Sequence, residues 1–278
     1  MERICDLHAH TIYSDGTFTP RELVKAAKDA GLAAVALTDH NTVDGLPEFL
    51  AAAKELGVEG IPATEFSVYY NGKELHLIGM FLPEASYERI SEVSEEVNRR
   101  KQENYKDLLK TLRSIGYELD YEELRAGTPK GNFNRAHVAK ALVDKGYMPS
   151  VKEAFSKLLN PDCGYYKEPE RLSVWEILEI FLEVGAVPVL AHPFLNLTEE
   201  DLEEFLPLAK ERGLVGMECA YSLFDAEAEA KAKELALRYG LKFSGGSDFH
   251  GEVKPDISLG TGKGSLRVPY AWLEALRP

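Results

Sequence analysis

Residues 3–10 read Arg-Ile-Cys-Asp-Leu-His-Ala-His, a short apolar run that ends in two histidines separated by one residue. An apolar run of this length, bounded by polar residues, predicts a buried strand. A helix start follows at Thr19, with Pro20 at the first helical position and Glu22 three residues past the cap. A strand followed by a helix is the first half of a strand-crossover-strand unit, so the chain opens as an α/β protein.

The same alternation continues along most of the chain. Further strands are predicted at residues 33–38, 58–63, 74–81, 186–191, 214–219 and 241–244. Helical patterns separate most of these strands, which predicts a parallel sheet with crossovers. Residues 84–170 interrupt the rhythm with a polar, mostly helical stretch. We therefore expect a barrel-type α/β domain formed by residues 1–83 and 171–278, and a helical insertion at 84–170 that covers the barrel mouth.

Composition restricts the classes of function. The 278 residues carry a net charge of -14, which argues against sequence-independent binding to duplex DNA but allows an anionic substrate held by local positive charge. Three scattered cysteines form no disulfide framework, and the N-terminus lacks a secretory leader, so a cytoplasmic location is expected. No apolar stretch is long enough to cross a membrane, so no membrane partner is expected.

Six of the seven histidines lie at or near strand ends, together with three carboxylates. The nine candidate metal ligands are His8, His10, Asp15, His40, Glu65, His76, His192, Asp248 and His250. Side chains that follow parallel barrel strands converge on one mouth. Each residue has an ordinary alternative: His76 suits an apolar core, and Asp15 and Asp248 suit turns. Metal binding accounts for all nine positions at once.

The residue types indicate which ions and which chemistry to expect. Imidazole and carboxylate ligands suit zinc, manganese or iron, and nine ligands are about right for three divalent ions. Three such ions exceed the charge of three carboxylates and one hydroxide by about two units, which attracts an anionic group. Metal ions also lower the pKa of bound water to about 7 in favourable sites. The pattern therefore predicts phosphate-ester hydrolysis by a metal-bridging hydroxide.

These motifs resemble the PHP family, named for polymerase and histidinol phosphatase. The matching stretches are residues 6–10 with 14–16, residues 37–41, Glu65 with His76, residues 191–193 and residues 246–251. The resemblance spans almost the whole chain and implies a distorted (βα)7 TIM-like barrel with three metal ions.

The resemblance also implies a ligand set for each ion. One ion takes His8, His10, Glu65 and Asp248; a second shares Glu65 and takes His76 and His192; a third takes Asp15, His40 and His250. Among these residues, the catalytic candidates are Asp15, His192 and Asp248.

The insertion narrows the expected substrate. Arg135-Ala136-His137 resembles a segment of members that hydrolyse nucleoside 3',5'-bisphosphates or trim RNA from its 5' end, although those members commonly have proline where Ala136 stands. Arg135 is a candidate phosphate clamp, His137 is a candidate substrate contact, and Lys130 is a weaker candidate.

The expected substrate is thus a small phosphorylated nucleotide or a short 5'-phosphorylated oligonucleotide. Three alternatives stay open: a phosphatase for another small molecule such as histidinol phosphate, a metal-dependent amidohydrolase, and a non-catalytic metal-binding regulatory module.

Overall fold

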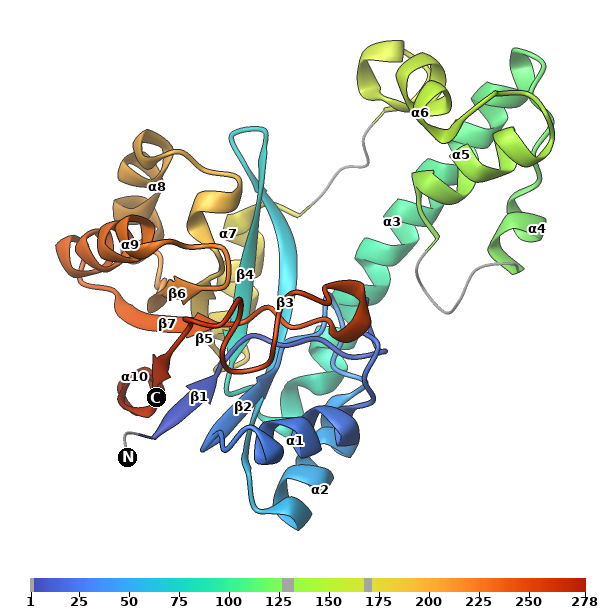
Figure 1. Ribbon diagram of the computed structural model, residues 1–278. Helices are drawn as coiled ribbons and strands as arrows, with labels where there is room; N and C mark the ends of the chain where they lie inside the picture. The colour runs from blue at the N-terminus through green and yellow to red at the C-terminus, as the bar shows by residue number, and fades with distance from the viewer. Residues whose placement is uncertain (1–2, 127–132, 168–171) are drawn as a thin grey trace. The chain divides into compact units, whose positions relative to one another are not determined.

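A computed structural model describes residues 3–126, 133–167 and 172–278 (Figure 1). The chain divides into two compact units, one formed by Met1–Glu92 with Leu172–Pro278 and the other by Val93–Arg171. The first unit contains every strand of the sheet. Lys130 and the expected domain boundary at residues 170/171 lie outside the described residues.

The first unit is built on one eight-stranded sheet. Its strands lie in the order β7-β6-β5-β4-β3-β2-β1-β8. Their bounds are β1 Ile4–Asp6, β2 Ala34–Leu37, β3 Glu59–Tyr70, β4 Lys73–Met80, β5 Val187–Leu190, β6 Gly216–Tyr221, β7 Lys242–Gly246 and β8 Val268–Pro269. Seven of these strands lie at the positions that the sequence predicts.

The sheet curves until β1 and β7 meet, which nearly closes a barrel. The amide of Leu7 donates to the carbonyl of Gly245 at 3.2 Å, and Asp248 donates to the carbonyl of His8 at 2.8 Å. A Cβ on Gly246 would lie 2.4 Å from the Cβ of His8, so the two segments approach this closely only with glycine there. The closure places the histidine motif after β1 beside the motif after β7.

The sheet is mixed, which corrects the expectation of a parallel sheet. β4 runs antiparallel to both β3 and β5, and β8 runs antiparallel to β1. β3 and β4 form a hairpin joined by Asn71 and Gly72, both with positive φ, as a two-residue turn of the I′ class requires. Glu65 therefore lies within β3, whereas the sequence suggested that it follows a shorter strand.

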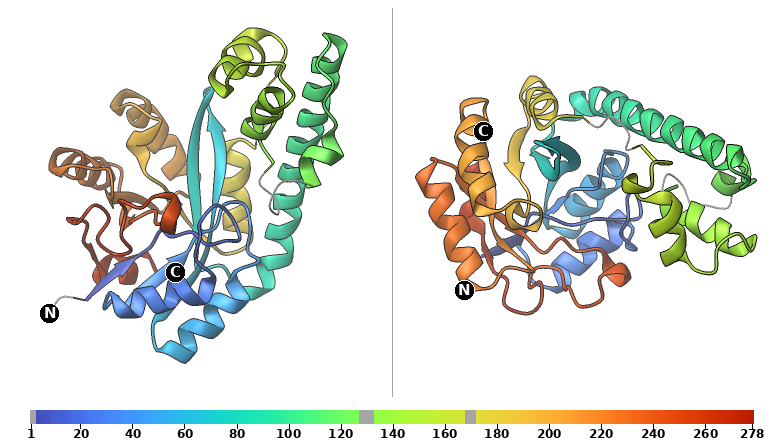
Figure 2. Two further views of the ribbon diagram at one scale, coloured as in Figure 1. Left: turned by 45° about the vertical axis from the view of Figure 1, so that its right-hand side comes forward. Right: turned by 90° about the horizontal axis from the view of Figure 1, so that it is seen from above.

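Helices lie on the outside of the barrel (Figure 2). The principal ones are α1 Pro20–Asp29, α2 Leu46–Leu56, α7 Val174–Glu183, α8 Glu199–Glu211, α9 Ala226–Arg238 and α10 Tyr270–Leu276. The predicted start of α1 is confirmed, because Thr19 and Glu22 form a complete capping box. α2 ends at Gly57, which adopts the left-handed conformation at φ 72°.

The inward face of the β3–β4 hairpin changes character along its length. Ile61 and Ala63 of β3 and Ile78 of β4 belong to the buried apolar cluster of the barrel. Glu65 pairs directly with Ile78, so it continues the same face, and His76 is two residues from Ile78 on that face. Alternate residues of a strand lie on one face, so the same face of the hairpin holds apolar core residues at one end and candidate ligands at the other.

The second unit is helical and has its own core. Its elements are the part of α3 (Tyr87–Ser114) beyond Glu92, with α4 Tyr121–Ala126, α5 Arg135–Asp144, α6 Val151–Ala154 and two short helices at Phe155–Leu159 and Pro161–Cys163. The buried side chains come mostly from α3, α5 and the 155–159 turn, with others from α4, α6 and the connecting segments, and include Leu108, Leu112, Leu142 and Leu159. Whether this unit covers the barrel mouth stays a prediction.

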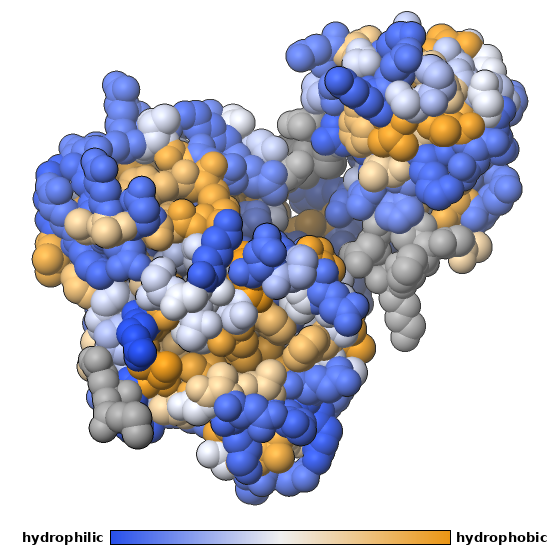
Figure 3. Space-filling model, in the orientation of Figure 1, coloured by the Kyte–Doolittle hydropathy of each residue, from blue (hydrophilic) through white to orange (hydrophobic). Residues whose placement is uncertain are grey.

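Figure 3 shows charged and polar residues over much of the visible face of each unit, with apolar residues in smaller groups between them. Across the described residues, no helix combines the length and apolar character that crossing a bilayer requires.

Candidate metal centre

The structure brings the nine predicted ligands together at one end of the barrel. His8 and His10 follow β1, with Asp15 on the loop beyond them, and His40 follows β2. His192 follows β5, and Asp248 and His250 follow β7. Glu65 and His76 lie within the hairpin. Because β4 is antiparallel, its N-terminal half lies at the same end as the C-terminal ends of the parallel strands.

Three ligand atoms form a cage of the size that a metal ion requires, and a fourth lies beside it. His8 Nε2 lies 3.1 Å from His10 Nε2 and 3.2 Å from Glu65 Oε2, and His10 Nε2 lies 3.3 Å from that same oxygen. Asp248 Oδ1 lies 3.6 Å from His8 Nε2 and 3.2 Å from His10 Nε2. Tetrahedral ligands at typical zinc distances are separated by about 3.3 Å, so the atoms of His8, His10 and Glu65 fit one ion, with Asp248 Oδ1 next to the two histidines.

The carboxylate of Glu65 faces two groups of histidines. Its Oε2 faces His8 and His10, and its Oε1 lies 2.9 Å from His76 Nδ1 and 3.1 Å from His192 Nε2. Glu65 is fully buried, and its Oε2 has no hydrogen-bond partner. A buried carboxylate oxygen among imidazole nitrogens, without a donor, is the environment of a metal ligand. This geometry supports a carboxylate shared between two ions.

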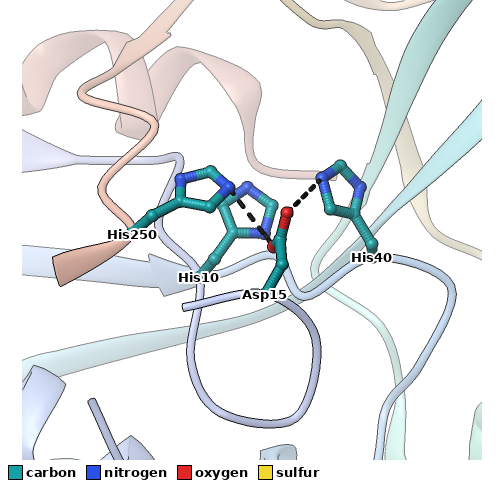
Figure 4. A group of neighbouring side chains, drawn as sticks. All are labelled: His10, Asp15, His40 and His250. Atoms are coloured by element: carbon teal, nitrogen blue, oxygen red, sulfur yellow. Dashed lines mark ion pairs between the residues drawn. The ribbon is translucent and has the colours of Figure 1, made fainter. Parts of the chain in front are cut away.

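A third group surrounds Asp15 (Figure 4). Asp15 Oδ1 lies 3.2 Å from His250 Nε2, and Asp15 Oδ2 lies 3.9 Å from His40 Nε2. The other ring nitrogen of His40, Nδ1, lies 3.1 Å from Glu65 Oε2 and has no hydrogen-bond partner. His40 therefore stands between the Asp15 group and the Glu65 group, and either group could use it.

The carboxylates hold protons on several of the buried imidazoles. Burial lowers the pKa of His10, but Asp248 and Glu65 outweigh burial and raise it to about 9. The pKa of His76 rises to about 10 for the same reason, against burial and chiefly because of Glu65. Burial prevails at His40 and lowers its pKa to about 3. In the absence of a metal, protons on His10 and His76 thus neutralise carboxylates that a divalent ion would otherwise neutralise.

The pKa values of the buried carboxyl groups shift downward. Burial alone would raise the pKa of Glu65, but His8 and His40 lower it well below the usual range. The pKa of Asp248 is also lowered, against burial, by His8 and His10. Both groups are therefore ionised at neutral pH and available as ligands.

We expect metal binding to release protons. At pH 7.5 the predicted ligands His10 and His76 carry a proton, because their pKa values are about 9 and 10, so each must lose that proton before it binds a metal. Titration of metal-free protein with Mn²⁺ in buffers of different ionisation enthalpy should show release of about one to two protons. Equal enthalpies in all buffers would contradict the predicted protonation. Release should diminish above pH 10, where both histidines are already neutral.

Glu218 is a further functional candidate, to which the sequence alone assigned no role. It is fully buried in β6 and accepts two hydrogen bonds: His8 Nδ1 lies 3.0 Å from Oε1, and the amide of His192 donates to Oε2 at 2.6 Å. A carboxylate on the far nitrogen of a metal-binding histidine orients the ring and raises its basicity. The available signal was an acidic residue inside the otherwise apolar run Gly216–Tyr221.

Other buried groups hold the ligand loops. Asp39 accepts from the amide of Thr11 at 2.7 Å and from the hydroxyl of Ser14 at 2.6 Å, which secures the loop that carries Asp15. His192 and Asp248 both have positive φ, 25° and 55° respectively. Non-glycine residues keep such conformations only where the surrounding structure enforces them, as at functional sites.

The two candidate substrate contacts, Arg135 and His137, lie in the helical unit. Arg135 donates to the carbonyl of Leu159 at 3.1 Å and stacks over the ring of Tyr166 at 4.4 Å. His137 accepts from the amide of Asn134 at 3.2 Å, which caps α5. Ala136 donates its amide to Asn134 at 3.0 Å, a bond that a proline there would lack. The roles of Arg135 and His137 in substrate binding stay predictions.

Comparison with known proteins identifies relatives over most of the chain. A family model described as the PHP domain matches residues 6–161. The chain is 28% identical to a 5'-3' exoribonuclease of Haemophilus influenzae over 251 residues, which cover 90% of this chain and 91% of that one. It is 28% identical to a 3',5'-nucleoside bisphosphate phosphatase of Chromobacterium violaceum over 256 residues, covering 91% and 90%.

One further relative and one solved structure are also similar to most of the chain. A phosphoribosyl 1,2-cyclic phosphate 1,2-diphosphodiesterase of Eggerthella lenta is 28% identical over 251 residues, covering 89% of this chain and 94% of the relative. A solved structure from Bifidobacterium adolescentis, described as a metal-dependent phosphoesterase, superimposes with a TM-score of 0.74 at 28% identity and covers 99% and 95% of the two chains.

Proposed function

The chain belongs to the PHP domain family, and we propose that it is a metal-dependent phosphoesterase that removes a phosphate group from a nucleotide. The proposed substrate is a nucleoside 3',5'-bisphosphate or a short 5'-phosphorylated oligonucleotide. The observation that carries the proposal is the gathering of six histidines with Asp15, Glu65 and Asp248, in which His8, His10 and Glu65 form a cage of metal-binding size.

We assign three divalent ions, of manganese, iron or zinc, to the centre. His8, His10, Glu65 and Asp248 would hold one ion; Glu65, His76 and His192 a second; Asp15, His40 and His250 a third. Bound divalent ions supply Lewis acidity toward phosphoryl oxygens and lower the pKa of coordinated water. The buried imidazoles and carboxylates described above fit this donor set.

The side chains of the chain itself position these groups and define the catalytic candidates. Glu218 holds the ring of His8 and the backbone of His192 in fixed relation. Asp15 is the most exposed of the three carboxylate ligands, at 47%, so it lies on the solvent side of the centre, where substrate arrives. Asp15, His192 and Asp248 are the residues we propose to act at the reacting phosphate.

We also propose a cytoplasmic location, with which the three free cysteines are in keeping.

A substrate panel with Mn²⁺ added tests the proposal. Phosphate release should be fastest from a nucleoside 3',5'-bisphosphate or from the end of a short 5'-phosphorylated oligonucleotide. Histidinol phosphate and a ribosyl cyclic phosphate serve as the competing substrates. Faster turnover of either competing ester, with both nucleotide substrates inert, would retain the metal centre and reject the nucleotide assignment.

Replacing Arg135 with alanine should mainly weaken nucleotide binding. A charged hydrogen bond to phosphate contributes about 1.5–3 kcal/mol, so KM for the bisphosphate should rise about tenfold or more while kcat changes little. Arg125 is an exposed arginine of α4 in the same unit, so Arg125→Ala is the matched control. Equal KM values for Arg135→Ala and the control would remove Arg135 from the substrate contacts.

A further inference from the structure

We propose that Lys254 contacts the substrate and donates a hydrogen bond to a phosphoryl oxygen held at the metal centre. This proposal rests on the proposed function, since it concerns the phosphate that the centre would bind. Lys254 follows the short turn Gly251–Val253 after β7, six residues beyond Asp248. Its ammonium lies 2.7 Å from Asp248 Oδ2.

Lys254 is distinguished by its partner. Within residues 3–126, 133–167 and 172–278, it is the one lysine or arginine that forms an ion pair with Asp15, Glu65, Asp248 or Glu218. The other described side-chain contacts of these carboxylates are made by histidines, by the hydroxyl of Ser14 at Asp15 Oδ1 and by the hydroxyl of Tyr221 at Asp248 Oδ2, at 3.2 Å and 2.8 Å respectively. A permanent cation therefore stands beside Asp248, next to the cage of His8, His10 and Glu65.

The two oxygens of Asp248 have different roles. Oδ1 faces His8 and His10 at the side of the cage. Oδ2 faces away from the cage and receives both Tyr221 and Lys254. Oδ2 accepts one hydrogen bond from Tyr221 and one from Lys254, so Asp248 uses only one of the N–H groups of Lys254. An ammonium has three N–H groups, and the bond to Asp248 leaves two for another acceptor.

Accessibility and rigidity favour a substrate contact. The side chain of Lys254 is 36% exposed, whereas that of Asp248 is 6% exposed, so the ammonium lies at the solvent boundary of the centre. Its segment is held to the loop after β1, because the amide of Glu252 donates to Thr17 Oγ1 at 3.0 Å. A cation fixed in advance beside a phosphate site stabilises the anion without the cost of ordering a free lysine.

A purely structural reading assigns Lys254 only the task of neutralising Asp248. Charge distinguishes the two readings. Glutamine at position 254 keeps an N–H donor for Asp248 Oδ2 but loses the positive charge, so a structural role should survive this change. A direct contact with phosphate should not survive it, since a charged hydrogen bond is about twice as strong as a neutral one.

The experiment measures binding of inorganic phosphate to the Mn²⁺-loaded protein by calorimetry, which needs no turnover. Lys254→Gln and Lys254→Met should each bind phosphate about tenfold or more weakly than the unaltered protein. Lys54→Met is the matched control, because Lys54 is an exposed lysine in the last turn of α2, just before β3 begins. Bound manganese is measured in every variant.

The outcomes are distinct. Phosphate affinity within twofold of the unaltered protein in Lys254→Gln, with manganese retained, would overturn the proposal and leave Lys254 as a positioning residue for Asp248. Unaltered protein that binds no phosphate would overturn it as well. Weakened phosphate binding in Lys254→Gln at full manganese content would support it. If the unaltered protein binds phosphate but releases none from nucleotides, the nucleotide assignment fails while the Lys254 contact stands.

Discussion

Glu65→Gln is expected to reduce phosphate release by about a thousandfold or more and to lower the number of bound metal ions. Glu65 is the residue on which the histidine groups converge: its two oxygens lie within 3.3 Å of nitrogens from His8, His10, His40, His76 and His192. An amide in its place carries no charge and presents an NH2 group to one of these sets of nitrogens.

Activity and metal content together test this prediction. Metal content is measured by elemental analysis after dialysis, and phosphate release is measured on the best substrate of the panel. Glu55→Gln is the control, because Glu55 is an exposed glutamate of α2 that pairs with Arg21. Full activity or full metal content in Glu65→Gln would contradict the shared-ligand assignment.

Glu218→Gln is expected to lower metal affinity or kcat/KM about 10–100-fold, the usual cost of losing a carboxylate behind a metal-binding histidine. The two oxygens of Glu218 accept from His8 and from the backbone of His192, and His192 has a φ of 25°. A glutamine can accept only one of these bonds, and its NH2 group would oppose the other donor. In Glu218→Gln, either the His8 ring or the His192 amide therefore loses its hydrogen-bond acceptor.

The readout separates a positioning role from a general loss of stability. Excess Mn²⁺ should restore much of the activity of Glu218→Gln, since the ligands themselves remain, whereas it should not restore Glu65→Gln. Thermal unfolding of both variants, measured without metal, provides the stability control. Activity of Glu218→Gln that equals the unaltered protein at limiting Mn²⁺ would show that Glu218 does not support the centre.

The sequence by itself determined the positions of seven of the eight strands, the start of α1, the end of α2 and the identity of the candidate ligands. These features are local: a capping box at Thr19 and Glu22, a left-handed glycine at Gly57, and short apolar runs followed by histidine each depend on a few neighbouring residues. The polar residues after strands were informative because parallel strands end at a common edge. The PHP motifs lie on these same short segments.

Tertiary structure decided what depends on strand pairing. The Asn-Gly pair at residues 71–72 is a hairpin signal, but the expected strand at 58–63 ended well before it, so the hairpin was not predicted. The antiparallel direction of β4 therefore became evident only in the folded sheet, and that direction brings His76 to the mouth beside Glu65. Closure of β1 against β7 likewise unites residues 240 positions apart.

Pairing also decided which polar groups support the ligands. Glu218 and Lys254 resemble ordinary acidic and basic residues in the sequence, because nothing local shows that one contacts His8 and the other Asp248. Contacts between distant segments depend on how the curved sheet closes, and that closure is set by the packing of all eight strands together. The sequence thus determined the ligand types and their strands, and the closed sheet determined their partners.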